Sequence, residues 1–316
     1  MKSLLAVLRV GVSDVLFISE LTPMDPNVRL TKRDSPEVVD PRLHRRMRSI
    51  VGCLSYLVNM TRPDLAFTYS QLSKFVQSPG PVHLAAAERA LAYLRGTYNE
   101  GITYCDSGEE RRNKLTGWVD SDFAADRDTR KSMTGYLFSL NGGAVSWRSS
   151  RQGGVTFSSA EAEFVAASQA GQEAVYLRAL LRGFNFRQFG ATEIWEYNAS
   201  CIMMSENPAI RERTRHVDTR VHYLRELVRD GHVKLLKCAG RCADQKPSAS
   251  GPCQTSAIHV GHTYSFFSFL SLSQNWTAPD GVLQYHHIMR ISSRTRRLRN
   301  ISSVCALVCM CVCVSI

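Results

Sequence analysis

The sequence predicts a mixed α/β fold, preceded by a small helical bundle and followed by an irregular tail. Three amphipathic helical patterns lie between residues 41 and 98, and short runs rich in β-branched and aromatic residues follow Gly96. The region 251–316 shows neither pattern. We therefore expect an extended or disordered segment over residues 1–40, a helical unit over 41–98, an α/β domain over 99–247 and a disordered tail over 248–316.

The first two segments differ in composition and period. The stretch "TPMDPNVRLTKRDSPEVVDP" is rich in Pro, Asp and basic residues, which is typical of an extended linker. The next stretch, "LHRRMRSIVGCLSYLVNM", is expected to be a helix, and a second helical pattern places Pro63 in its first turn. The apolar stripe of the first helix consists of Met47, Ile50, Val51, Leu54, Leu57 and Val58. A third helix is expected to bury Leu84, Ala87, Ala90, Leu91 and Leu94, so that three helices with short loops form a bundle.

The middle of the chain alternates between strand and helix patterns. Strands are expected in "GITYC", "LTGWVDSDFA", "TGYLFSL" and "AVSWRS", and "NGG" at 141–143 predicts a hairpin turn. A long helix follows, with Ser158 and Glu161 at the spacing of a capping box. The strand "TEIWEYN", a short helix, an Arg-rich helix ended by Gly231 and the strand "HVKLLKCA" complete a mixed sheet with flanking helices.

The C-terminal region has an unusual composition. Residues 251–316 contain no Lys and no Glu, and Asp280 is their only acid. A disordered tail outside the fold is the first interpretation, and a small Cys-rich interaction module is the alternative. The run Val304–Ile316 is too short to cross a bilayer, so we expect a soluble protein with no membrane partner. The scattered cysteines favour a reducing compartment, either cytoplasm or nucleus.

The net charge of +11 suggests an acidic partner, with nucleic acid as the first candidate. Lys131, Arg148 and Arg151 flank the expected hairpins and are candidate phosphate contacts, the alternative being ordinary surface charges. Three tryptophans in the strand region are expected to pack in the core or against the hairpins rather than stack on bases. They are Trp118, Trp147 and Trp195.

The stretch "WVDSDFAAD" places acids among large apolar residues, where bare carboxylates are costly. Asp120 therefore needs a cation, hydrogen bonds or water. Glu163, early in the long helix, and Asp218, at the start of the Arg-rich helix, are candidates to join it. Carboxylates that cluster favour Mg²⁺ or Mn²⁺, and two such ions can hydrolyse a phosphodiester. The alternative is that each acid is an ordinary cap or surface charge.

Two stretches resemble the ribonuclease H domain of copia-type retrotransposon Pol polyproteins. They are "LTGWVDSDFAADRDTRKSMTGYLFSLNGGAVSWRSSRQGGVTFSSAEAEFVAASQAGQEAVYLRALL" and "NPAIRERTRHVDTRVHYLRELVRDGHVKL". The segment "SIVGCLSYLVNMTRPDLAFTYSQLSKFVQSPGPVHLAAAERALAYLRGT" is similar to the connection between reverse transcriptase and ribonuclease H in that family. The resemblance extends from about Thr22 to about Pro247 and implies a ribonuclease H-like sheet.

The resemblance implies cleavage of the RNA strand of RNA–DNA hybrids by two Mg²⁺ or Mn²⁺ ions. It assigns metal-binding and catalytic roles to Asp120, Glu163 and Asp218, with other Pol segments as partners in an intact element. The third acid of the family falls at Tyr197 in "IWEYNAS", and strand alternation predicts that the adjacent Glu196 points to the opposite face.

Tyr197 would remove a ligand and a negative charge, so weakened metal binding and impaired cleavage are expected. A catalytically dead nucleic-acid-binding remnant and a non-functional relic of the element are the alternatives. An integrase core, which shares the fold, is a weaker alternative because Glu163 directly follows the hairpins.

Overall fold

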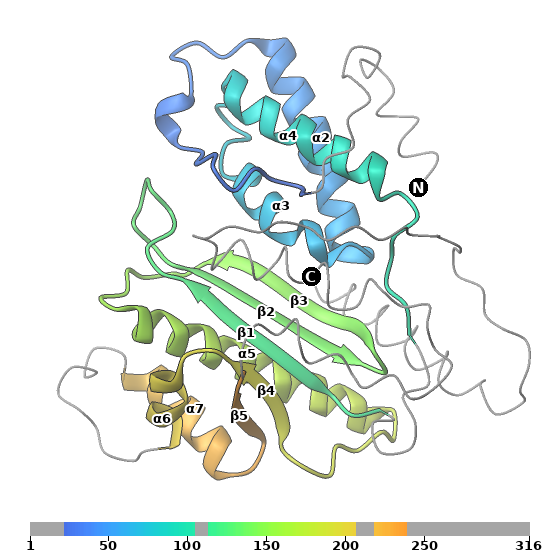
Figure 1. Ribbon diagram of the computed structural model, residues 1–316, viewed down its shortest axis with the longest axis vertical. Coiled ribbons are helices and arrows are strands. Elements are labelled where there is room, and N and C mark those ends of the chain that lie inside the picture. Colours follow the sequence, from blue (N-terminus) through green and yellow to red (C-terminus); the bar gives the residue numbers. More distant parts are fainter. Residues whose placement is uncertain (1–21, 105–112, 207–217, 239–316) are drawn as a thin grey trace, which may run out of the picture. The chain divides into compact units, whose positions relative to one another are not determined.

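The computed structural model describes residues 22–104, 113–206 and 218–238, with the side chains of 218–221 outside the description (Figure 1). These residues divide into two compact units, and the division falls between Gly101 and Ile102. The sequence analysis placed this boundary between residues 98 and 99. Within the described ranges, none of the helices has the length and apolarity needed to cross a bilayer.

The first unit is built around helix α2 (Pro41–Met60), with α3 (Ala66–Ser73) and α4 (Pro81–Gly96) packed on it. Asp40 caps α2 by accepting a hydrogen bond of 2.8 Å from the Arg42 amide, and Pro41 occupies the first helical position. The buried residues of α2 are the six expected from its apolar period. They are Met47, Ile50, Val51, Leu54, Leu57 and Val58, and the prediction for this helix is confirmed.

Helix α4 buries Ala87, Ala90 and Leu94 as expected, but the rest of its buried face differs from the prediction. His83 and Tyr93 are fully buried, whereas Leu84 and Leu91 are only half-buried. The polar atoms of His83 find partners, because the Gly80 amide donates to Nδ1 at 2.9 Å and Nε2 lies 3.0 Å from the Thr31 carbonyl oxygen. Satisfied hydrogen bonds thus allow polar residues into a core position that periodicity assigns to leucine.

The segment before α2 is more ordered than its composition predicts. A short 3-10 turn, η1 (Lys32–Asp34), lies within it, and Met24 and Leu30 are buried. The Thr31 carbonyl binds His83 of α4. Described residues 22–40 therefore belong to the helical unit, although they contain little regular structure.

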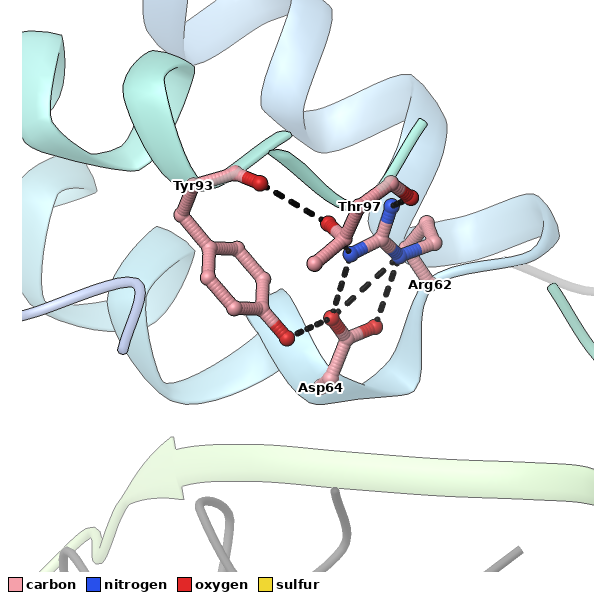
Figure 2. Close-up of polar contacts among 4 residues, drawn as sticks. All are labelled: Arg62, Asp64, Tyr93 and Thr97. Carbon is pink, nitrogen blue, oxygen red and sulfur yellow. Dashed lines mark hydrogen bonds and ion pairs between the residues drawn. The ribbon is translucent and has the colours of Figure 1, made fainter. Parts of the chain in front are cut away.

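A buried ion pair connects the segment after α2 with the end of α4 (Figure 2). Arg62 lies before the 3-10 turn η2 (Pro63–Leu65) and is 1% exposed. Its guanidinium binds Asp64 at 2.7 and 2.9 Å and also donates to the Thr97 carbonyl and hydroxyl oxygens. Tyr93 donates its hydroxyl proton to Asp64 at 2.9 Å. Burial alone would lower the pKa of Arg62, but the hydrogen bonds and charge of Asp64 raise that pKa above its usual range.

The second unit contains a five-stranded mixed sheet of order β3-β2-β1-β4-β5. The strands are β1 (Thr116–Asp122), β2 (Met133–Leu140), β3 (Gly143–Arg151), β4 (Thr192–Glu196) and β5 (Val233–Lys237). The first three are antiparallel neighbours, while β4 runs parallel to both β1 and β5. Asn141 and Gly142 adopt positive φ angles of 51° and 77°, as a tight hairpin turn requires. The mixed α/β prediction is confirmed, but residues 101–104 of the expected strand "GITYC" are not in a strand.

One face of the sheet is covered by helices α5 (Ser159–Gly183), α6 (Ala199–Glu206) and α7 (Asp218–Arg229) (Figure 1). Core residues of the strands include Val119, Phe138, Ile194 and Leu235. They pack with Phe164 of α5 and with Cys201 and Leu224 of the two shorter helices. This core holds α5 against β1 and thereby fixes where the first turns of α5 meet the sheet.

The cysteines of the described residues follow no common pattern. Cys53 and Cys201 are free thiols, and burial raises the pKa of both. Cys238 is disulfide-bonded. The sequence analysis took the scattered cysteines to favour a reducing compartment, and the disulfide at Cys238 departs from that interpretation.

Removal of the cap of α5 tests how strongly this helix start is held. Ser158 accepts a hydrogen bond of 3.1 Å from the Glu161 amide. Ser158→Ala is expected to lower the free energy of unfolding by about 1 kcal/mol, because one amide at the helix start loses its partner. Urea denaturation monitored by tryptophan fluorescence measures the change, with Ser159→Ala as the matched control. An equal effect of both substitutions would contradict the capping role.

Candidate metal centre

Three acids come from adjoining elements at one edge of the sheet. Asp120 lies near the C-terminal end of β1, Glu196 is the last residue of β4, and Glu163 lies in the first turns of α5. Strands β1 and β4 are parallel neighbours, so their C-terminal ends meet at the same edge. The C-terminal edge of parallel strands is where α/β proteins commonly place their sites.

The three carboxylates are buried and incompletely partnered. Asp120 is 7% exposed, Glu163 is 8% exposed and Glu196 is fully buried. The Asn198 amide donates to Oε1 of Glu196 at 2.9 Å. Oε2 of Glu196 and Oε2 of Glu163 are buried without a hydrogen-bond partner. Unpartnered buried oxygens are uncommon in proteins and call for a ligand or a bound proton.

The electrostatics show that the three acids act on one another. Burial raises the pKa of each carboxyl, and repulsion adds to the rise. For Glu163 the repelling charges are Glu196 and Asp120, and for Glu196 the repelling charge is Asp120. Hydrogen bonds from backbone amides lower these pKa values: the Ser121 amide acts on Asp120, and the Asn198 amide acts on Glu196. The acids therefore share one buried region in which negative charge is disfavoured.

The prediction that Glu196 faces away from the metal site is wrong with respect to Glu163, because the charge of Glu196 raises the pKa of Glu163. Ile194 belongs to the core beneath α5, and strand alternation puts Glu196 on the same side as Ile194. Tyr197 follows the last residue of β4 and is 40% exposed. The sequence analysis counted alternation from Tyr197, on the assumption that the family position points inward, whereas the inward position is one residue earlier.

The fourth candidate, Asp218, is the first residue of α7, and its side chain lies outside the described residues. Among described side chains, no three His, Cys, Asp or Glu residues converge tightly enough to form a finished metal site. The donor set is nevertheless all carboxylate, with two oxygens left without partners. Such a set suits Mg²⁺ or Mn²⁺ and excludes the sulfur and nitrogen ligation of a structural zinc site.

The candidate phosphate contacts lie around the antiparallel half of the sheet. Arg151 forms an ion pair with the buried Asp126 at 2.9 Å, and this pair stabilises the loop after β1. Lys131 donates to the Gly153 carbonyl, and Arg148 donates to the Ser150 hydroxyl at 3.1 Å. Arg148 is exposed and makes no ion pair within the described residues. It is therefore the residue of the three with the most freedom to bind a phosphate.

The three tryptophans form part of one row across the sheet. The strand register pairs Trp147 with Leu137, Leu137 with Trp118, and Trp118 with Trp195, and the row ends at Leu236 of β5. Leu137, Trp118, Trp195 and Leu236 each stand next to a residue of the core beneath α5. Ser146, next to Trp147, donates to Glu173 of α5 at 2.7 Å, so the whole row lies on the other face. The tryptophans are half-buried. Sequence patterns located each residue but could not show that they align.

The chain has relatives among known proteins. No protein-family model matches the chain. It is 37% identical over 219 residues to "Retrovirus-related Pol polyprotein from transposon TNT 1-94" of Nicotiana tabacum. That alignment covers 68% of this chain and 16% of the polyprotein. It is 32% identical over 246 residues to the corresponding polyprotein from transposon RE1 of Arabidopsis thaliana, covering 77% of this chain and 16% of the relative. The chain belongs to the copia-type retrotransposon Pol polyproteins.

Two further similarities involve proteins of other kinds. This Pol chain is 47% identical over 129 residues to "Secreted RxLR effector protein 161" of Plasmopara viticola, covering 41% of the chain and 89% of that protein. Among solved structures, it is similar to a foamy viral protease–reverse transcriptase in complex with an RNA/DNA hybrid. That similarity has a TM-score of 0.35 and 10% identity, and covers 81% of this chain and 30% of the viral one. The Pol chain aligns with only 16% of the length of the two polyproteins above.

Proposed function

We propose that the second unit is a ribonuclease H domain that hydrolyses the RNA strand of RNA–DNA hybrids with divalent metal ions. The observation that carries the proposal is the shared burial of Asp120 and Glu163 at the edge of the sheet. These acids stand at the positions that the resemblance assigns to metal ligands. Its partners would be an RNA–DNA hybrid and other segments of the Pol polyprotein.

Asp120, Glu163 and Asp218 would hold the ions, and the fit rests on the all-oxygen donor set and the unpartnered Oε2 of Glu163. Bound Mg²⁺ or Mn²⁺ would activate a water and neutralise charge on the leaving oxygen. Burial of the carboxylates excludes bulk water and strengthens their attraction for a cation. Arg148 and Lys131 would contact phosphates of the substrate, and Arg151 would hold the loop after β1 through Asp126.

We further propose that cleavage is slow compared with intact members of the family. Tyr197 stands where the resemblance expects a carboxylate, and its hydroxyl is neutral. A lost ligand weakens the hold on a cation whose charge supplies much of the stabilisation of the transition state. The domain would then retain its substrate but turn it over poorly.

A labelled RNA–DNA hybrid, incubated with the full chain and Mg²⁺ or Mn²⁺, tests the proposal. Asp120→Asn and Glu163→Gln are expected to reduce cleavage at least about a hundredfold, because each removes a metal-binding charge. Tyr197→Asp is expected to raise it. Asp128→Asn, which removes an exposed acid after β1, is the control and should leave the rate unchanged. Cleavage that persists in Asp120→Asn at the original rate would refute the proposed reaction.

A nucleic-acid-binding protein without cleavage is the second candidate. The observation that favours it is the absence of a finished metal site among described side chains, together with the net charge of +11. A gel shift of the same hybrid, run with EDTA, distinguishes the two. Binding without cleavage under all metal conditions would support the second candidate over the first.

A further inference from the structure

We propose that Glu196 supplies the third metal-binding carboxylate, one residue before the position at which the family carries it. The inference rests on the proposed function, since it concerns the same metal centre. It concerns a residue that the resemblance assigns to no role. Three features of the structure carry it: the placement of the side chain, its unpartnered oxygen and the absence of a neutralising partner among the described residues.

The backbone fixes Glu196 at the end of β4. Its carbonyl oxygen accepts a hydrogen bond of 2.9 Å from the Cys238 amide, next to β5. Its side chain lies on the core side of the sheet, together with Ile194 and below α5. One carboxylate oxygen, Oε1, accepts the Asn198 amide. The side chain is therefore held in one orientation, and ordering it around a cation would cost little conformational entropy.

The second oxygen, Oε2, is fully buried and has no hydrogen-bond partner. The described groups that act on this carboxylate are another acid, Asp120, and the backbone amides of Tyr197 and Asn198. A buried charge left unpaired is strongly destabilising in general. A cation from solution would partner both Glu196 and Glu163, whose Oε2 atoms are the unpartnered carboxylate oxygens of this region.

The exchange of an Asp at position 197 for a Glu at position 196 is chemically reasonable. Tyr197 is 40% exposed and follows the strand, whereas Glu196 is turned into the region of Asp120 and Glu163. The metal centre of this chain would then include Glu196 together with Asp120 and Glu163.

A purely structural role is the competing explanation. Glu196 would then be a neutral acid, held by the Asn198 amide and indifferent to metal ions. Glutamine has the same shape and also accepts that hydrogen bond, so Glu196→Gln should preserve a structural role. It should not preserve metal binding, because an amide oxygen carries no net charge and is a weaker ligand for a hard cation.

Isothermal titration of the full chain with Mn²⁺ measures the role directly, without any need for activity. Glu196→Gln is expected to weaken Mn²⁺ binding at least about tenfold, a loss of about 1.4 kcal/mol. Glu193→Gln is the matched control on the same strand. It removes an exposed acid paired with Lys114 at 2.8 Å and should bind Mn²⁺ like the unmodified chain. Asp120→Asn is the reference for a variant without the centre.

Each outcome has a distinct meaning. Weak binding by Asp120→Asn and unchanged binding by Glu196→Gln would overturn the role of Glu196 and leave the proposed function standing. No Mn²⁺ binding by the unmodified chain would overturn both. Circular dichroism and urea denaturation in EDTA accompany the titration. Glu196→Gln should be at least as stable as the unmodified chain, because it removes a buried repulsion, and a loss of folding would contradict the inference.

Discussion

Arg62→Met is expected to destabilise the helical unit by about 3–5 kcal/mol, a large part of the about 5–15 kcal/mol by which an ordinary domain is stable. The substitution keeps an unbranched apolar side chain but leaves the Asp64 carboxylate buried, with only the Tyr93 hydroxyl as its described partner (Figure 2). It also strips the Thr97 carbonyl and hydroxyl of their bonds to the guanidinium. Hydrogen exchange of peptides from α2 and α4 reports on this unit separately from the sheet.

Two variants make the experiment decisive. Arg229→Met removes the ion pair with Asp230 at the surface, where the arginine side chain is 73% exposed, and should leave stability almost unchanged. Arg62→Met combined with Asp64→Leu removes both buried charges and should recover part of the lost stability. Normal exchange protection in Arg62→Met alone would show that the network in Figure 2 contributes little.

Periodicity predicted the elements whose burial depends on apolar side chains alone. The stripe of α2 from Met47 to Val58 and the hairpin at Asn141 and Gly142 are of this kind. In both, a single local rule decides the structure: 3.6 residues per turn in the helix, and tolerance of positive φ in the turn. The sheet order could not be read in the same way, because β4 joins β1 across the whole of α5.

The errors have a different physical origin. His83 and Tyr93 are buried because partners far away in the sequence, Thr31 and Asp64, satisfy their polar atoms. A sequence pattern contains no information on such partners. Glu196 was misplaced because a strand has period two, so a register error of one residue exchanges the two faces completely. Only the core neighbour Ile194 identifies which of Glu196 and Tyr197 faces inward.

Asp120 was predicted as a site residue from its apolar sequence context, and Glu163 from its place in the first turns of the long helix. Their proximity was implied by the resemblance, and their mutual electrostatic effect is visible in the structure. Arg151 illustrates the opposite case. Its charge predicts a surface contact, but its partner Asp126 is 25 positions earlier and 2% exposed. Net charge thus suggests a class of binding partner, but only the folded structure shows which basic side chains are not already paired with an acid.

The stability of the metal-free protein is expected to fall as pH rises from about 5 to 9, by up to about 1.4 kcal/mol per pH unit for each buried acid. The pKa of Asp120, of Glu163 and of Glu196 is higher in the folded state than in the unfolded chain, through burial and mutual repulsion. Asp122 adds to the repulsion on Asp120. The folded state therefore retains protons that the unfolded chain releases above its ordinary pKa of about 4.5. The associated stability is complete below that pH and is lost as pH climbs toward the raised pKa values.

Urea denaturation in EDTA, followed by the fluorescence of Trp118, Trp147 and Trp195 in the sheet, measures this dependence. Glu163→Gln should flatten the profile and raise stability at pH 9, because an amide neither titrates nor repels the remaining acids. Glu193→Gln changes an exposed acid of the same sheet and should retain the slope of the unmodified chain. A profile that is flat in the unmodified chain would show that the three carboxylates are not desolvated together. It would thereby remove the electrostatic reason for a cation at this edge of the sheet.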